Sequence, residues 1–201
     1  MICDTLRQVI EFSHMNEIHI AKANEDDFLK LAELDYQLKN TKKFDVLMRD
    51  QTISLQERDL QSPVLQKSIN YTNEINEYAH ALIQSDVFAL IAYCDKQPVG
   101  YIFSRKQDWP GGIVFVIEGI LVANKFRGKD IAQKLVMSFV EGIKKIDGCR
   151  GFSVELDTDK YEACHLFLKM GAKFAGTKLY VYSNEDPGGG TKEAIYFFYK
   201  L

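Results

Sequence analysis

The apolar and polar positions of the chain predict a series of short strands separated by helices. Residues 17–22 alternate between apolar and polar side chains, which is typical of a half-buried strand. The run 113–122 is almost wholly apolar and predicts a buried strand, with a single charge, Glu118, at its middle. Other strands are predicted over 87–94, 99–104, 151–156, 173–182 and 193–200.

Helices are predicted where apolar residues recur every three or four positions. One begins after Asn24, a second begins at Pro63, and a third spans 129–146. A fourth follows the capping-box pattern Asp159-x-x-Glu162 and ends at Gly171. Residues 39–59 are too densely charged to be assigned to either class.

The predicted order is β α α β β β α β α β β. Consecutive strands joined by short turns are antiparallel, whereas a strand–helix–strand unit needs a parallel pair. The chain is therefore expected to be α/β, with one central mixed sheet flanked by helices. Its 201 residues show no second domain boundary, so we expect a single domain over 17–201 that follows an N-terminal extension, 1–16.

Charge and hydropathy exclude several classes of partner. The net charge of −3 offers no excess of cations for a phosphate backbone, so a nucleic acid is not expected. No run approaches the ~20 apolar residues of a membrane span, which favours a cytoplasmic protein. Residues 1–100 carry 10 basic and 16 acidic residues, and residues 101–201 carry 15 and 12. Such an uneven distribution suits a cationic ligand on one half and an anionic ligand on the other.

The cysteines and histidines show no pattern typical of a metal site or of a nucleophilic catalyst. Cys3, Cys94, Cys149 and Cys164 form no CxxC pair, and we expect reduced thiols, with structural burial as the role of at least Cys94 and Cys164. Ser-His-Asp order and metal-ligand spacing are both missing, so hydrolases and metalloenzymes have no support. His165 is interpreted as a surface or capping residue, and Trp109 as an anchor packed in its loop rather than a lid.

A candidate anion site begins where the apolar strand 113–122 leads into Arg127-Gly-Lys-Asp-Ile-Ala132 and then a long helix. The first turn of a helix has unpaired N–H groups and a partial positive charge, which together can hold a phosphate or pyrophosphate. Lys125, Arg127 and Lys129 add formal charge around it. The alternative is an ordinary helix start that happens to carry basic residues.

These residues resemble the acetyl-CoA signature of the GCN5-related N-acetyltransferase (GNAT) superfamily, Arg/Gln-x-x-Gly-x-Gly/Ala. Arg127 matches its first position and Ala132 its last, while Asp130 stands where the family has its middle Gly. Residues 117–122, 154–156, 163–167 and 193–198 are similar to motifs of streptothricin acetyltransferases. The resemblance covers about residues 86–201.

The resemblance implies a role for each matching position. Main-chain groups of Ile120, Leu121 and Val122 would bond the pantetheine arm, and an N–H near Leu121 or Val122 would polarise the acetyl carbonyl. Phe167 would pack near the CoA sulfur, where the family has a Tyr that protonates the departing thiolate, so Phe167→Tyr is expected to raise turnover. The pyrophosphate would be lined by Arg127, Gly128, Lys129, Asp130, Ile131 and Ala132.

Two carboxylates are candidates for the acceptor side. An amine with a pKa near 10 must lose a proton before it attacks a thioester, and a half-buried Glu118 with a raised pKa is a candidate base or substrate anchor. The alternative is an ion pair that holds the sheet to a helix. Glu155 is a candidate substrate contact, although a strand edge often carries a Glu for solubility alone.

The expected activity is acetyl-CoA-dependent N-acetylation of a primary amine, by direct attack and without a metal. The resemblance suggests a small cationic acceptor, with a streptothricin-type antibiotic, and hence antibiotic resistance, as the leading suggestion. One alternative is a GNAT enzyme that acetylates a protein or peptide amine. Another is a catalytically weak acyl-CoA-binding module. The protein is expected to be a monomer or a homodimer.

Overall fold

The computed structural model describes residues 17–66, 71–179 and 193–201. Its helices are α2 (Glu25–Leu31), α3 (Tyr71–Ala81), the short 3-10 turn η1 (Asn124–Phe126), α4 (Ile131–Ile143) and α5 (Tyr161–Lys169). Its strands are β1 (Ile18–Lys22), β2 (Leu38–Arg49), β3 (Thr52–Gln66), β4 (Val87–Cys94), β5 (Gln97–Trp109), β6 (Gly112–Val122), β7 (Cys149–Asp157), β8 (Lys173–Lys178) and β9 (Ala194–Lys200).

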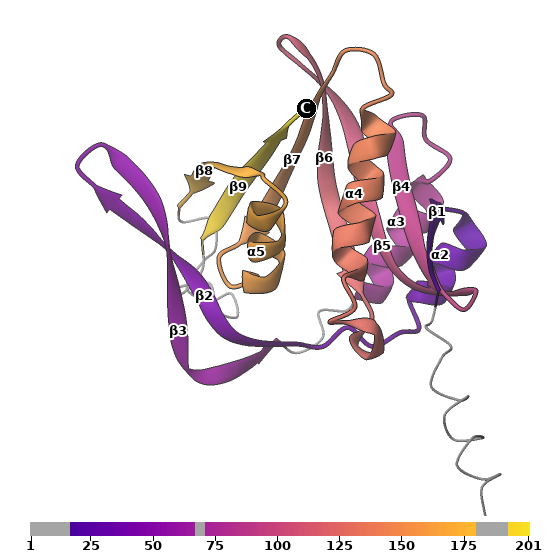
Figure 1. Ribbon diagram of the computed structural model, residues 1–201, viewed down its shortest axis with the longest axis horizontal. Coiled ribbons are helices and arrows are strands. Elements are labelled where there is room, and N and C mark those ends of the chain that lie inside the picture. The colour runs from indigo at the N-terminus through magenta and orange to yellow at the C-terminus, as the bar shows by residue number, and fades with distance from the viewer. Residues whose placement is uncertain (1–16, 67–70, 180–192) are drawn as a thin grey trace, which may run out of the picture.

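A seven-stranded mixed sheet in the order β1-β4-β5-β6-β7-β9-β8 forms the centre of the molecule. Its only parallel pair in the described residues is β6 with β7, which the connection through α4 requires. Helices α4 and α5 cover one face, and α2 and α3 cover the other (Figure 1). The predicted α/β class and the mixed, helix-flanked sheet are confirmed.

The parallel strands β6 and β7 pair over only half of β6. Their register runs from Ile113 with Cys149 to Ile117 with Val154. Beyond that point β6 stays paired with β5 as far as Val122, while β7 stays paired with β9. The two strands therefore splay apart inside the sheet, and the register of β6 against β5 shifts at the same place, leaving Glu118 as a bulge residue.

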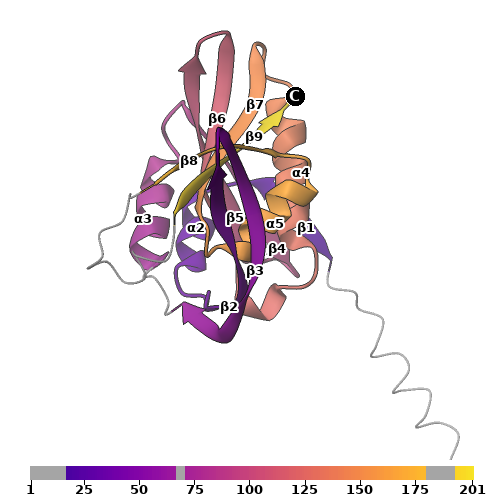
Figure 2. The ribbon, with the colours of Figure 1, turned by 90° about the vertical axis from the view of Figure 1, so that its left-hand side faces the viewer.

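A two-stranded ribbon, β2 with β3, occupies the region that the sequence left unassigned, and it projects from the body beside α5 (Figure 1). Figure 2 views the molecule from the side of this ribbon. Its base is held by a bond from the Phe44 N–H to the Thr158 carbonyl (2.9 Å) and by the stack of Phe44 on Tyr161. The predicted helix start at Pro63 is wrong, because Pro63 lies in β3 and the helix begins at Tyr71.

Most other boundaries differ from the prediction by a few residues. The helix predicted over 129–146 spans Ile131–Ile143. Trp109 ends β5 with its ring 6.3 Å from that of Phe198, but it is 39% exposed, so it is less packed than the predicted anchor. A tight turn with positive φ at Gly111 replaces the expected loop. The extension 1–16 and the end of the strand predicted over 173–182 lie outside the described residues. No helix in the described part of the chain is long and apolar enough to cross a membrane.

Candidate active site

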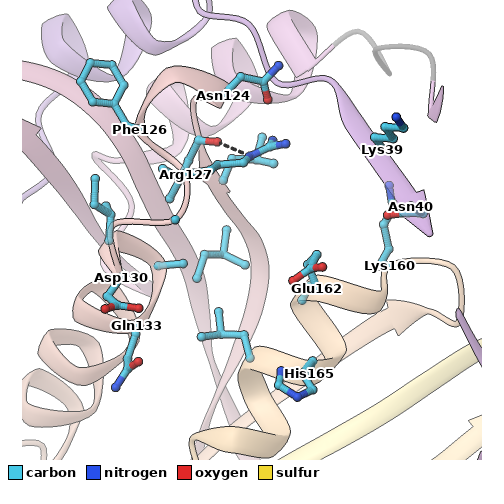
Figure 3. Close-up of a pocket in the computed structure, with 18 of the residues that line it drawn as sticks. Lys39, Asn40, Asn124, Phe126, Arg127, Asp130, Gln133, Lys160, Glu162 and His165 are labelled. Carbon is cyan, nitrogen blue, oxygen red and sulfur yellow. Dashed lines mark hydrogen bonds between the residues drawn. The ribbon is translucent and has the colours of Figure 1, made fainter. Parts of the chain in front are cut away.

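A cleft of about 660 Å³ opens where β6 and β7 splay apart. One wall is the end of β6 with the turn and the first residues of α4, and the opposite wall is α5, with β2 above (Figure 3). Its size lies within the range of small-molecule and cofactor sites. The predicted cofactor-binding residues that line it are Ile120, Leu121, Val122, Arg127, Gly128, Asp130, Ile131 and Ala132.

The turn before α4 presents main-chain N–H groups to the cleft. Gly128 and Asp130 both have positive φ, +73° and +55°, which turns the chain sharply into the helix. The Asp130 carboxylate makes no capping bond, so the N–H groups of the first turn stay free of side-chain partners in the described residues. Free N–H groups at a helix start fit a pyrophosphate.

The Arg127 side chain is bound to main-chain carbonyls instead of facing the anion site. Its guanidinium donates to the Val122 carbonyl (3.0 Å), the Gln37 carbonyl (2.6 Å) and the Tyr36 carbonyl (3.2 Å). It therefore ties the end of β6 to the segment that leads into β2. Burial lowers the pKa of this guanidinium, although nearby acidic and phenolic groups oppose that effect.

The main chain of β6 offers hydrogen-bonding groups to the splay. The Ala123 N–H donates to the Val99 carbonyl (2.9 Å), so the alternation of an antiparallel ladder directs the polar groups of Leu121 towards β5 and those of Ile120 and Val122 towards β7. Arg127 occupies the Val122 carbonyl. The groups that remain for an extended amide-bearing ligand are the Ile120 N–H and carbonyl and the Val122 N–H.

Two residues predicted to bind the cofactor lie outside the lining of this cleft. The exposed Lys129 holds its ammonium over the Phe126 ring, 5.6 Å from the ring centroid. Phe167 is fully buried in the core, with its ring 5.7 Å from that of Phe152. Their contacts with a cofactor remain predictions.

The two predicted carboxylates follow the last paired residues of β6 and β7 and share a face of the sheet. Val154 points into the core beneath α4 and α5, so the next side chain of β7, Glu155, points to the opposite face. The bulge residue Glu118 reaches that same face, because it contacts Arg105, whose guanidinium lies over the Phe103 ring on the α2–α3 side. The side chain of Glu118 is 31% exposed and pairs with Arg105 (Nε–Oε2 3.3 Å). Glu155 accepts a hydrogen bond from Tyr196, which raises the pKa of that phenol.

Arg105 is itself held in place by two groups near the start of β4. Its guanidinium donates to the Gln84 side chain (2.5 Å) and reaches Asp86 at 3.4 Å. Glu118 is therefore paired with an anchored cation, but this cation belongs to the neighbouring strand β5 and not to a helix, as the ion-pair interpretation of the sequence had it.

Several residues of the second wall were not predicted from the sequence. They come from β2, from α5 and from the residue that precedes α5. The Asn40 side chain of β2 donates to the Asp159 carbonyl in the segment before α5 (2.6 Å). His165, interpreted from the sequence as a surface residue, is exposed and lines the cleft (Figure 3). Basic residues outnumber acidic ones on this wall, and this excess is the one feature of the sequence that could have indicated an anion-binding wall here. The polar and charged members are Lys39, Asn40, Lys160, Glu162, His165 and Lys169.

Cys164 is not placed to carry an acyl group. It is fully buried, and its thiol lies 3.7 Å from the Asp157 carbonyl. Burial raises the pKa of this thiol to about 12, which keeps the nucleophilic thiolate scarce at neutral pH. Among the residues that the structure describes, no group of three or more His, Cys, Asp or Glu side chains could hold a metal ion.

Both the sequence and the fold of this chain are similar to those of known acetyltransferases. The family model described as "Acetyltransferase (GNAT) family" matches residues 49–172. A solved structure described as a streptothricin acetyltransferase from Bacillus anthracis, in complex with acetyl coenzyme A, is 20% identical with a TM-score of 0.74 and covers 92% of this chain and 99% of its own. A nourseothricin acetyltransferase is 18% identical with a TM-score of 0.73, over 91% and 98%.

A solved structure with lower sequence identity also has a similar fold. NAA60 from Arabidopsis thaliana, in complex with a bisubstrate analogue, is 13% identical with a TM-score of 0.62, and the match covers 92% of this chain and 98% of that one. No curated protein sequence matches the chain. At these identities the structural likeness shows the fold, whereas the family model spans more than half of the sequence. The chain therefore belongs to the acetyltransferase (GNAT) family, and it is an acetyltransferase whose acetyl donor is acetyl-CoA.

Proposed function

We propose that this protein transfers the acetyl group of acetyl-CoA to a primary amine of a small cationic molecule, with a streptothricin-type antibiotic as the leading acceptor. The observation that carries the proposal is the pair of carboxylates, Glu118 and Glu155, at the splay of β6 and β7. An acceptor that is protonated before it reacts is attracted by acidic side chains on its path.

In this proposal acetyl-CoA binds on one face of the sheet at the splay, and the acceptor amine binds on the other face. On the α4 side, the first-turn N–H groups hold the pyrophosphate, and the Ile120 main-chain groups bond the pantetheine arm. The Val122 N–H donates to the acetyl oxygen, where negative charge grows as the amine attacks. On the opposite face Glu118 and Glu155 bind and orient the ammonium group before it is deprotonated.

The chain's neighbours in fold support a small acceptor. The streptothricin and nourseothricin acetyltransferases match nearly their whole length with TM-scores of 0.74 and 0.73, whereas NAA60 reaches 0.62. Antibiotic resistance, a cytoplasmic location and the acceptor's identity are parts of this proposal. A peptide amine is the alternative acceptor, and we expect it to be the poorer substrate.

The test is a panel of amines assayed one at a time, with thiol release from acetyl-CoA as the readout. Streptothricin and spermidine represent small cations, and a peptide with a free N-terminus represents the alternative. We expect Glu155→Gln to raise KM for the small cations by about tenfold, or about 1.4 kcal/mol, and to change that for the peptide little. Acetylation of the peptide alone would overturn the proposal.

A further inference from the structure

Outside the residues already discussed, one half-buried carboxylate lies close to the splay. Glu74 is on α3, on the helix face that also carries Tyr71 and Tyr78, three residues before it and four after it. Its carboxylate accepts a hydrogen bond from Tyr101 of β5 (Oη–Oε1 3.4 Å) and another from Tyr78. The fold itself gives no obvious reason for an acidic residue at this position.

The side chains of Tyr101 and Tyr78 lie between Glu74 and strand β6. A Cβ atom at Gly119 would lie 3.3 Å from the Tyr101 hydroxyl and 2.8 Å from the Tyr78 ring, so both rings lie directly on the main chain of Gly119. Gly119 stands between the bulge residue Glu118 and Ile120, whose polar groups face the splay. The absence of a side chain at this position is what lets the tyrosines that hold Glu74 approach β6.

Glu74 lies close to charged residues at both strands that splay apart, Glu118 of β6 and Lys160, which follows β7. Glu74 and Glu118 both act on the Tyr78 hydroxyl, whose pKa is raised by burial and by these two carboxylates. Lys160, which follows β7 and lines the cleft, favours the charged form of Glu74, whereas Glu77 disfavours it. Burial is the largest influence and raises the pKa of the Glu74 carboxyl above its ordinary value.

The two carboxylates near the bulge differ in their partners. Glu118 is engaged in an ion pair with the anchored guanidinium of Arg105, so its carboxylate already has a charged partner. Glu74 has tyrosine hydroxyls as its hydrogen-bond partners, and these neither neutralise it nor compete for a proton at neutral pH.

We propose that Glu74, rather than Glu118, accepts the proton that the acceptor ammonium loses before its nitrogen attacks the acetyl carbonyl. The proposal rests on the acceptor face of the proposed function. The carboxylate takes one proton from R–NH3+, directly or through one water, to give R–NH2 and a carboxylic acid. The nitrogen then bonds to the carbonyl carbon, the C–S bond breaks, and the thiolate takes the second proton of the amine. Glu74 returns its own proton to solvent.

The kinetic test compares Glu74→Gln with Glu77→Gln, a matched change on the exposed side of the same helix. With streptothricin as acceptor, we expect Glu74→Gln to lower kcat by about 10²–10⁴-fold, the range of one general base, with KM changed by less than about threefold. The acidic limb of the wild-type pH profile should disappear. Glu77→Gln should keep kcat and keep the limb, moved slightly to lower pH because Glu77 disfavours the charged form of Glu74. A rise in KM alone would overturn the proposal and make Glu74 an anchor.

A stability measurement tests the same residue without any acceptor. Because burial raises the pKa of Glu74, the folded protein holds this proton more tightly than the unfolded chain, so wild-type stability falls as pH rises through that pKa. Glu74→Gln cannot ionise, and we expect its Tm to exceed that of the wild type at pH 8 and to converge with it near pH 4. A variant that is less stable at both pH values would show that Glu74 is a structural hydrogen-bond acceptor.

The two tests also separate this proposal from the proposed acceptor. If streptothricin is not acetylated but spermidine or the peptide is, the acceptor assignment fails, and the pH profile of Glu74→Gln with that amine still decides the role of Glu74. If streptothricin is acetylated and Glu74→Gln keeps the acidic limb, the acceptor assignment stands and the role of Glu74 is overturned.

Discussion

The Arg127 guanidinium donates to the Val122 carbonyl at 3.0 Å, so the residue that opens the acetyl-CoA signature is bonded to the strand that precedes it. The same side chain reaches the Gln37 and Tyr36 carbonyls. It therefore fixes the position of the pyrophosphate turn relative to β6 and β2. This contact explains why an arginine is needed here for its shape as well as for its charge.

Arg127→Lys tests this role, because it keeps the charge and loses the planar set of donors. A lysine can satisfy one of the three carbonyls, so we expect the free energy of unfolding to fall by about 2 kcal/mol and Tm by about 4–8 °C. Acetyl-CoA should also bind more weakly. Thermal melts and calorimetric titration measure both, and an unchanged Tm with weaker binding would assign Arg127 to the anion alone.

Asp130→Gly addresses the departure from the family signature. Asp130 has a left-handed backbone, which glycine adopts without steric cost, and its carboxylate lies at the end of the helix where a pyrophosphate would bind. We expect CoA to bind more tightly or equally well, with Tm little changed. Asp130→Asn, which removes the charge alone, should match it. A tenfold loss of affinity in both variants would reveal a favourable contact of the carboxylate.

Phe167→Tyr separates two expectations. The family resemblance suggests that a hydroxyl here would protonate the thiolate and raise turnover. In the structure the ring is fully buried against Phe152, so a new hydroxyl meets the core. Burying it without a partner costs about 1–3 kcal/mol, and we expect a lower Tm with no gain in kcat. A severalfold rise in kcat with an unchanged Tm would support the family role.

Cys164→Ala tests direct attack against an acyl-enzyme. The thiol is buried and its pKa is raised to about 12, so we expect kcat to be retained within about threefold. Initial-velocity plots against both substrates should intersect. Parallel lines for the wild type, or an acetyl group retained on the protein after incubation with acetyl-CoA alone, would contradict direct attack.

The middle of the central sheet could be predicted because β4 and β6 are largely buried and their sequences are nearly continuous apolar runs, and the edge strand β1 because its apolar and polar residues alternate. The ribbon of β2 and β3 could not. Each of its strands pairs only with the other, so few apolar residues are required, and Phe44 is one of the few that it buries. Pro63 is tolerated there because the register is broken between the pairs Lys42–Asp59 and Asn40–Val64.

The site was predictable as far as its local sequence patterns extend. The turn before α4 follows from the Arg-Gly sequence and the apolar strand before it. The partners of the Arg127 side chain could not be foreseen, because Tyr36 and Gln37 lie about 90 residues upstream and no local pattern connects them. Glu74 carried a usable signal, since its spacing from Tyr71 and Tyr78 puts an acidic residue on the buried face of a helix.

The most direct test of the acceptor assignment is a competition between two amines in one reaction. Streptothricin and a peptide with a free N-terminus, at equal concentrations, share limiting acetyl-CoA, and mass spectrometry gives the ratio of the two acetylated products. That ratio is the ratio of their kcat/KM values. We predict that acetylated streptothricin exceeds acetylated peptide by at least about 100-fold, or about 2.8 kcal/mol. An equal or larger amount of acetylated peptide would contradict the proposed function.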